Sequence, residues 1–379
     1  ARLSRELAGG ATDQRALVPA AYRETVERAV HFVQFYRESL DRHERRYRNE
    51  GTDVEQRVLD LAAKAADAMR GPWTEIRQAA SQAATLCLGD PETLQASKAY
   101  TETVLTPLLL DAPMIRRSYG KPLGYPGDYQ VMLYYYNNAL EGDSAFAKVF
   151  HKFFVEHPLS HGVRTRKDYI VDALGREHRR ATGARAGGTF RAASLGCGPA
   201  REIADYVRRA GAWHGDAVFT LIDQEDETLS VAHRDAGAAL ARTGADGALQ
   251  CLNLSFGQLL AEPDLLPDRN PQDVIYSTGL FDYLRESRAQ PLLRALYERL
   301  APGGLLLIGN ALGPNRHFWS PEFVLDWTLL YRTDAEMRRL AAQLPEEAEV
   351  DVELETGGAY WFLVVRRPGS PGDDAATTE

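Results

Sequence analysis

The sequence predicts an α/β fold, in which a doubly wound, mostly parallel sheet follows an α-helical N-terminal domain. After Phe190, short β-branched or apolar runs alternate with helical stretches, a pattern typical of strands joined by right-handed crossovers. From Ala21 to about Leu110, apolar residues instead recur at helical spacing. A chain of 379 residues also exceeds what one core usually supports. We therefore expect a helical cap or lid domain over 1–165, an α/β domain over 166–367 and a disordered polar tail over 368–379.

The N-terminal helices are predicted from two apolar stripes, whose simplest interpretation is core packing. The stripes comprise Val26, Val30, Val33, Tyr36 and Leu40, and then Val54, Val58, Leu61, Ala65 and Met69. Helix-breaking residues are expected to separate the helices at Gly51, at Gly71 with Pro72, and at Gly89 to Pro91.

The strands of the second domain are predicted from their short apolar runs. Parallel strands are expected over 192–195, 217–222, 249–254, 274–277 and 305–308, and intervening helices over 200–212, 227–242 and 287–300. Two further runs, 350–354 and 360–365, are separated by a turn at Gly357 and Gly358. These two runs should form an antiparallel hairpin.

Net charge and cysteine content indicate which kind of molecule the protein binds and in which compartment it works. The net charge is −9 and the pI is near 5.6, which argues against a general nucleic-acid binder and favours a small-molecule partner. Cys87, Cys197 and Cys251 show neither metal spacing nor a disulfide framework, which fits a reducing cytosol. No signal peptide and no run of eighteen apolar residues is present, so a cytoplasmic protein without a membrane span is expected. A homodimer is left open.

The segment "FRAASLGCGPAREI" places Gly196 and Gly198 where the first strand turns into a helix. Ligands of open α/β sheets bind at the carboxyl ends of the strands, and glycine lets the backbone approach them closely. Asp223 ends the next strand, where its carboxylate suits the two hydroxyls of a ribose or caps the following helix. A dinucleotide fingerprint needs a third glycine, and Ala200 and Arg201 follow here instead.

This arrangement resembles motif I of the class I S-adenosylmethionine-dependent methyltransferases. "LQCLNLS", "QDVIYSTGLFDYL" and "LAPGGLLLIGN" resemble its third strand, motif IV and fifth strand, in the expected order. The resemblance implies a Rossmann-like, mostly parallel seven-stranded sheet with a C-terminal antiparallel hairpin, and S-adenosyl-L-methionine as cofactor. It implies cofactor contacts from Gly196, Cys197, Gly198, Asp223, Gln224, Asn253, Leu254, Ser277 and Gly279, with Arg164 or Arg166 on the methionine carboxylate.

Two positions depart from this pattern. Ser194 stands where many members carry an acid that orients the site around the methionine amino group, so another side chain must take that role. Ala200 replaces the usual third glycine. Arg164 and Arg166 also fit a solvent-facing helix with ordinary arginines.

A closer resemblance begins in the first half of the chain. "KPLGYPGDY", "HGVRTRKDYI", "SLGCGPAREI" and "GLFDYL" are similar to bacterial methyltransferases that make a 3-hydroxy fatty acid methyl ester signal, from about Arg116 to Tyr331. This resemblance implies a lipophilic acid as the acceptor, although relatives with this architecture also act in specialised metabolism. The tyrosine-rich stretch "RRSYGKPLGYPGDYQVMLYYYNN" is interpreted as a lid, with an interdomain connector as the alternative.

Candidate groups for the reaction follow the predicted strand ends and the lid. Asp282, Tyr125 and His317 are the catalytic candidates, and the substrate-binding candidates are Asp128, Tyr283, Asn310, Trp319 and Arg332. Plainer roles stay open: a helix cap for Asp282, packing for His317 and a solvent-facing position for Arg332. No metal is expected.

Three functions remain in view. The first is methylation of a small molecule, either O-methylation of a lipophilic carboxylic acid or modification of a specialised metabolite. The second is a ring closure through a methyl-derived carbon, with the same cofactor. The third is a non-catalytic scaffold that binds the cofactor.

Overall fold

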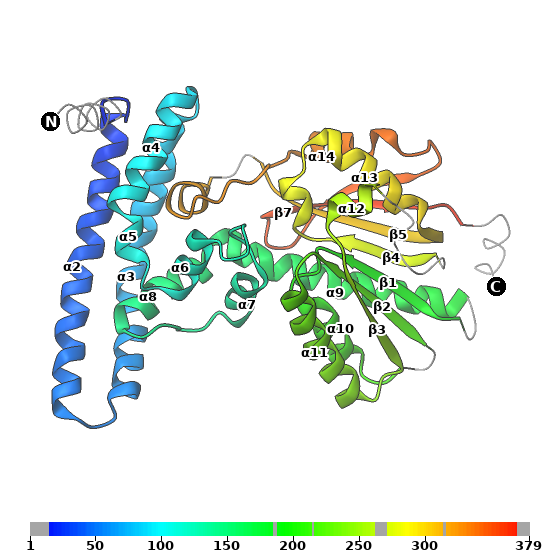
Figure 1. Cartoon of the computed structure of the whole chain (residues 1–379), viewed down its shortest axis with the longest axis horizontal. Helices are drawn as coiled ribbons and strands as arrows, with labels where there is room; N and C mark the ends of the chain where they lie inside the picture. Colours follow the sequence, from blue (N-terminus) through cyan, green and yellow to red (C-terminus); the bar gives the residue numbers. More distant parts are fainter. Residues whose placement is uncertain (1–14, 185–187, 214–215, 262–270, 314–315, 370–379) are drawn as a thin grey trace. The chain divides into compact units, whose positions relative to one another are not determined.

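The described helices and strands fall into two compact units (Figure 1). The structure, a computed structural model, describes residues 15–184, 188–213, 216–261, 271–313 and 316–369. Described parts of Ala1–Ser160 and Asn315–Thr328 form a helical unit, and described parts of His161–Pro314 and Leu329–Glu379 form a sheet unit. The sequence interpretation assigned residues 316–328 to the second domain, but they group with the helical unit. From residue 370 onward, the predicted tail lies outside the described residues.

The helical unit begins with two 31-residue helices that lie side by side (Figure 1). Its elements are α2 (Ala20–Glu50), α3 (Val54–Ala84), η1 (Thr85–Cys87), α4 (Pro91–Val104), α5 (Thr106–Leu109), α6 (Pro113–Gly120), α7 (Tyr129–Asn137), α8 (Ala145–Val155) and η4 (Ser320–Val324). Both predicted stripes supply buried residues, among them Val26, Val33, Val58 and Met69. Gly51 ends α2 in the left-handed conformation, as a predicted helix stop should.

The predicted break at Gly71 and Pro72 is wrong, because α3 continues through both residues. Pro72 is exposed on the helix and lacks only its own N–H, so a single hydrogen bond, to the Ala68 carbonyl, is lost. Trp73, immediately after it, is buried against Phe150, with ring centroids 5.3 Å apart. Aromatic burial on this face offsets the roughly 3 kcal/mol that an interior proline costs.

The segment 316–328 joins the helical unit through buried polar and aromatic contacts. The Trp319 indole Nε1 donates to the Tyr22 hydroxyl at 3.0 Å, and that hydroxyl also lies 2.7 Å from the Thr101 hydroxyl. The Thr106 hydroxyl donates to the Val324 carbonyl at 2.9 Å. These bonds fix the segment to α2, α4 and α5.

The sheet unit contains seven strands in the order β3-β2-β1-β4-β5-β7-β6, which confirms the predicted fold class. The strands are β1 (Phe190–Leu195), β2 (Ala217–Asp223), β3 (Gly247–Asn253), β4 (Gln272–Ser277), β5 (Leu300–Ala311), β6 (Glu349–Leu354) and β7 (Tyr360–Arg366). β1 to β5 pair in parallel, whereas β7 is antiparallel to both β5 and β6. The carboxyl ends of β1, β2 and β4 therefore meet at one edge of the sheet.

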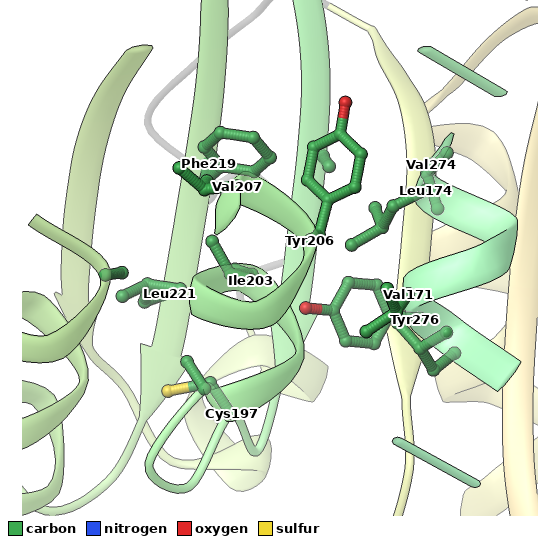
Figure 2. Close-up of a cluster of buried hydrophobic side chains, with 14 of the residues drawn as sticks. Val171, Leu174, Cys197, Ile203, Tyr206, Val207, Phe219, Leu221, Val274 and Tyr276 are labelled. Carbon is green, nitrogen blue, oxygen red and sulfur yellow. The ribbon is translucent and has the colours of Figure 1, made fainter. Parts of the chain in front are cut away.

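Helices cover both faces of this sheet (Figure 1). They are α9 (Pro158–Ala184), α10 (Arg201–Ala210), α11 (Asp226–Thr243), α12 (Phe256–Ala261), η3 (Leu280–Tyr283), α13 (Glu286–Glu298), α14 (Asp334–Leu340) and η5 (Ala341–Gln343). Successive strand residues, such as Val274 and Ile275, belong to cores on opposite faces of the sheet, as the two-residue period of a strand requires. Figure 2 shows the first core, in which Leu174 of α9 and Ile203 of α10 pack over β2 and β4.

The C-terminal hairpin approaches α9 closely, and two glycines permit this contact. A Cβ on Gly162 would lie 2.5 Å from the Ala359 Cβ, and one on Gly357 would overlap the Thr165 hydroxyl. Glu355 accepts hydrogen bonds from the backbone amides of the turn, including that of Ala359 at 2.7 Å. The predicted Gly357–Gly358 turn is thus confirmed.

β6 forms one edge of the sheet, because it pairs only with β7. Its acidic residues Glu349, Asp351 and Glu353 are all exposed. Val352, between them, is buried.

Replacing Pro72 by alanine should raise the free energy of unfolding by up to about 3 kcal/mol, because the helix regains a hydrogen bond at an exposed position. Thermal or urea denaturation of the full chain measures this. Pro91→Ala is the matched control, since Pro91 occupies the first turn of α4, where proline is tolerated. A Pro72→Ala variant no more stable than wild type would contradict this account of α3.

Candidate functional site

The turn after β1 has an unusual backbone. Gly196, Gly198 and Ala200 all adopt positive φ, at 63°, 52° and 45°. A Cβ added to Gly198 would meet no atom within 4 Å, so this glycine faces open space. Ala200 takes the conformation that a third glycine would take more easily, at a cost of roughly 1 kcal/mol. The turn therefore presents bare backbone at the carboxyl end of the central strand.

Asp223 lies at the end of β2, next to this turn. Its Oδ2 accepts the Gly198 amide at 3.0 Å, and its Oδ1 accepts the Glu225 amide at 3.2 Å. Burial raises the pKa of Asp223, and the two amides act in the opposite direction. Each carboxylate oxygen keeps a lone pair for a further donor. Asp223 does not serve as the N-cap of α11, because Glu225 occupies that position.

The end of β3 lies beside Asp223, since Asp223 pairs with Asn253 in the sheet. The Leu254 amide donates to the Asp223 carbonyl at 3.0 Å, and Asn253 Nδ2 donates to the Gln224 carbonyl at 3.1 Å. Gln224 and Asn253 are exposed. Hydrogen bonds and strand pairing therefore connect these four residues, which were predicted as cofactor contacts, with one another and with the glycine turn. Cys197 lies inside the turn and is buried, and burial raises the pKa of its thiol well above the usual value.

The segment "QDVIYSTGLFDYL" comprises β4 and the η3 turn that follows it. Ser277 is fully buried, and its hydroxyl makes no hydrogen bond within the described residues. A Cβ on Gly279 would lie 3.3 Å from the Arg166 Nη2, so this guanidinium lies directly against the Gly279 backbone. Arg166 is buried and its guanidinium also covers the Tyr360 ring, 4.5 Å from the centroid, whereas Arg164 is only half-buried. Of the two candidate arginines, Arg166 is therefore the one at the end of β4.

Asp282 is buried next to Arg166. Its Oδ1 accepts the Ala311 amide at 2.7 Å, and its Oδ2 lies 3.8 Å from the Arg166 Nη1. Burial raises the pKa of Asp282 to about 6, although Arg166 and the Ala311 amide lower it. The carboxylate thus joins α9 to the end of β5. Its predicted catalytic role stays a prediction.

Arg332 is buried, so the solvent-facing alternative for it is wrong. It donates to the Phe281 carbonyl at 2.8 Å, and also to the Leu284 carbonyl and the Asn310 side chain. Asn310 Nδ2 donates to the Leu330 carbonyl at 2.8 Å. Arg332 thus holds the η3 turn, and Asn310 connects Arg332 to the Leu330 backbone. Both residues were predicted as substrate ligands, and that role stays a prediction. Tyr283 in the η3 turn is 43% exposed.

Four other predicted site residues, Tyr125, Asp128, His317 and Trp319, belong to the helical unit. Asp128 is the N-cap of α7 and is paired with Arg117 at 2.7 Å, while Tyr125 in the same loop is half-buried. Trp319 is a fully buried core residue. His317 lies with its ring centroid 6.1 Å from that of His157, edge to face. The predicted lid over a cofactor stays a prediction.

Sequence reasoning missed Glu202, in the first turn of α10. Glu202 is 5% exposed, and its Oε1 accepts the Tyr276 hydroxyl at 3.0 Å. That hydroxyl also bonds the Ser194 side chain, at the position where an acid was expected. Burial raises the pKa of Glu202, and Lys167 and Arg166 lower it. The signal that could have found it is the acid at the end of "GPARE", directly behind the glycine turn.

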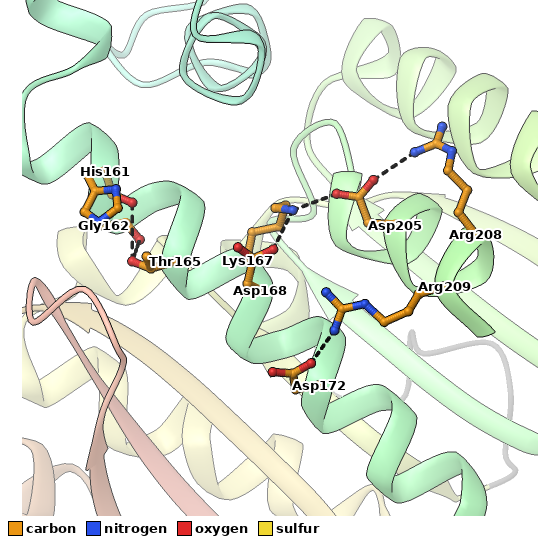
Figure 3. Close-up of polar contacts among 9 residues, drawn as sticks. All are labelled: His161, Gly162, Thr165, Lys167, Asp168, Asp172, Asp205, Arg208 and Arg209. Atoms are coloured by element: carbon orange, nitrogen blue, oxygen red, sulfur yellow. Dashed lines mark hydrogen bonds and ion pairs between the residues drawn. The ribbon is translucent and has the colours of Figure 1, made fainter.

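Polar contacts fix α9 against α10 beside this acid (Figure 3). Lys167 donates to Asp205 at 2.7 Å, and Asp205 accepts from Arg208 at 2.8 Å. Further along the two helices, Asp172 pairs with Arg209. The contacts between α9 and α10 therefore fix the position of Arg166 on α9 relative to Glu202 on α10.

Within the ranges that the structure describes, no three His, Cys, Asp or Glu side chains are arranged to hold a metal ion. None of the described helices combines the length and the apolar character that crossing a bilayer requires.

Comparison with known proteins yields matches among solved structures only. Neither a protein-family model nor a curated protein matches this sequence. A possible exported protein from Bordetella parapertussis is 17% identical, with a TM-score of 0.49, over 92% of this chain and 97% of that one. The magnesium protoporphyrin IX methyltransferase ChlM from Synechocystis, with bound SAM, is 13% identical, with a TM-score of 0.40, over 67% of this chain and 95% of that one.

The N-methyltransferase NodS from Bradyrhizobium japonicum is 14% identical, with a TM-score of 0.32, over 52% of this chain and 95% of that one. Because these three TM-scores lie below 0.5 and the identities below 25%, the similarities establish nothing about the ligand or reaction of this chain.

The buried Asp282 should make stability depend on pH. Its pKa is about 6 in the folded protein against 3.8 for the ordinary value, so between these pH values the folded chain retains a proton that the unfolded chain releases. Wild type should therefore lose roughly 2 kcal/mol relative to Asp282→Asn as the pH rises from about 4 to about 7. Urea denaturation of both proteins across this range measures the difference. A difference that stays constant with pH would contradict the assignment.

Proposed function

We propose that this chain binds S-adenosyl-L-methionine at the carboxyl ends of β1, β2 and β4 and transfers its methyl group to a small-molecule acceptor. The observation that carries the proposal is the Asp223 carboxylate held beside the open Gly198 position. The residues present fit the cofactor, because the turn leaves room for a nucleoside and the neighbouring acid retains acceptor capacity for two hydroxyls.

Each part of the cofactor has a matching group in the sheet unit. Asp223 would accept the ribose hydroxyls, and Asn253 with Leu254 would border the adenine. Glu202 would face the methionine ammonium, taking the role that Ser194 cannot fill. Arg166 would pair with the methionine carboxylate, since its guanidinium is already buried against Gly279.

The bound cofactor supplies an electrophilic methyl group on a positively charged sulfur. The chain's own contribution is to hold the acceptor in line with that methyl, which can supply roughly 7 to 11 kcal/mol of the barrier. Asp282 supports this by holding Arg166 and the end of β5 in place. An ionised carboxylate acceptor needs no base, whereas a hydroxyl acceptor would need one.

For the acceptor we propose a lipophilic carboxylic acid, which is supported by the resemblance of "KPLGYPGDY" and "HGVRTRKDYI" to the fatty acid methyl ester enzymes. Incubation with methyl-labelled cofactor and a series of 3-hydroxy fatty acids tests this. The expected product is heavier than the acid by one methyl group and is released by alkaline hydrolysis, as an ester is. Label that enters other metabolites but none of these acids would exclude the acid while leaving methyl transfer intact.

Asp223→Asn should weaken S-adenosylhomocysteine binding by about tenfold or more, because charge-assisted bonds to the ribose are lost. Isothermal titration calorimetry measures the affinity. Asp226→Asn is the matched control, since Asp226 is an exposed acid in the first turn of α11. Equal affinities of Asp223→Asn and wild type would refute the proposed site.

Glu202→Gln should weaken S-adenosylhomocysteine binding by about tenfold but leave 5′-methylthioadenosine binding unchanged. The second compound lacks the amino acid portion, so it reports on the nucleoside site alone. Tyr276→Phe serves as the comparison, because it removes the hydroxyl that donates a hydrogen bond to Glu202 but keeps the Glu202 carboxyl group. Equal weakening of both ligands would assign Glu202 a purely structural role.

A further inference from the structure

A cavity of about 340 Å³ in the helical unit is bordered by α6, the loop after it and one side chain of α7. A Cβ on Gly120, which lines it, would meet no atom within 4 Å, so the cavity is open at this end of α6. Its volume falls within the roughly 300 to 1,000 Å³ of small-molecule sites. The lining residues are Pro113, Arg116, Arg117, Gly120, Pro122 and Tyr134.

Two neighbours fix the guanidinium of Arg117. Its Nε donates to both carboxylate oxygens of Asp128, at 2.8 and 2.7 Å, and Asp128 is 1% exposed and also caps α7. The guanidinium carbon lies 5.4 Å from the centroid of the Tyr129 ring. Because Asp128 engages only Nε, Nη1 and Nη2 make no hydrogen bond among the described residues. A guanidinium held in this way offers the pair of donors that binds an anion end-on.

Arg116 brings a second guanidinium to the cavity. It is exposed, and within the described residues no hydrogen bond or ion pair engages it. Since Asp128 offsets the charge of Arg117, the charge of Arg116 is left in excess at the cavity. Glu141 acts electrostatically on the same region and is itself countered by Lys148. One excess positive charge suits a singly charged anion better than a phosphate dianion, and the guanidinium fork matches a carboxylate.

The remaining walls of the cavity are rings. Pro113 and Pro122 supply pyrrolidine rings, and Tyr134 supplies a half-buried aromatic ring. The Tyr134 ring packs edge to face against that of His151, which is fully buried, with 5.0 Å between the centroids. Rigid, flat walls of this kind suit a flat ring better than a flexible chain, which would lose more entropy on binding.

We propose that this cavity binds the carboxylate of a planar aromatic acid, with the carboxylate on Arg116 and Arg117 and the ring against Tyr134 and the two prolines. The fixed guanidinium selects the carboxylate, and the walls select the ring. The site does not depend on the proposed cofactor site, because all its residues belong to the helical unit.

Calorimetry of the full chain with sodium 2-naphthoate tests the site. Naphthoate should bind saturably with one site per chain, and 2-naphthalenemethanol, which keeps the rings but lacks the charge, should bind about tenfold more weakly or worse. Arg116→Gln and Arg117→Lys should each lower the naphthoate affinity about tenfold or more. Lysine keeps a positive charge for Asp128 but has no planar fork. Arg28→Gln is the matched control, since Arg28 is an exposed arginine of α2 and does not line the cavity.

Thermal unfolding separates binding from a structural role. Naphthoate should raise the Tm of wild type, and should raise that of Arg117→Lys much less. If Arg117→Lys is itself unstable, Arg116→Gln and Gly120→Met decide, because both positions are exposed. The Gly120→Met side chain would enter the open space beside α6, so this variant should lose naphthoate binding and keep the Tm of wild type within a few degrees.

Four results would overturn the proposal. The first is no saturable binding of naphthoate by wild type, and the second is an unchanged affinity in Arg116→Gln and Gly120→Met. The third is a loss of affinity in Arg28→Gln as large as that in Arg116→Gln, which would indicate attraction by surface charge alone. The fourth is binding of the alcohol or of 2-naphthyl phosphate at least as tight as that of naphthoate.

Discussion

The hydrogen bond from the Gly198 amide to the Asp223 carboxylate is the constraint on which the carboxyl edge of the sheet depends. This hydrogen bond joins the turn after β1 to the carboxyl end of β2. The positive φ angles of Gly196 and Gly198 give the turn the conformation in which the Gly198 amide points toward Asp223. The Leu254 amide on the Asp223 carbonyl extends the same connection to β3. Because Asp223 is buried, its charge is favourable only with such donors around it, so the hydrogen bond that shapes the turn also stabilises the ionised carboxylate.

Much of the sheet unit was predictable because its local patterns and its topology agree. The apolar runs mark strands, and parallel order then forces the residues after each strand, such as Asp223, Asn253 and Ser277, to a common edge. The two glycines before Tyr360 were sufficient to predict the hairpin. What local pattern could not supply is the partner of each polar side chain. Glu202 and Arg166 become neighbours of the site only through the packing of two helices.

The helical unit shows the other limit of sequence reasoning. Pro72 looked like a helix stop, but the contribution of Trp73 to the core outweighs it. Trp319 and His317 follow β5 directly, so their position in the chain predicted a place beside the strands. The buried bond from Trp319 to Tyr22, which lies 297 residues away in sequence, places them elsewhere. Contacts between residues so far apart in the sequence produce no hydrophobic periodicity from which they could be predicted.

The acidic edge strand β6 has a consequence for assembly. An exposed strand offers unpaired backbone groups to any second strand, which is how sheets extend from one molecule to the next. Glu349, Asp351 and Glu353 lie along this strand, and only Asp351 of the three is paired in the described residues with an arginine, Arg338, so two copies of the strand would repel each other. Charge thereby opposes the growth of continuous sheets and fibrils through β6 at neutral pH.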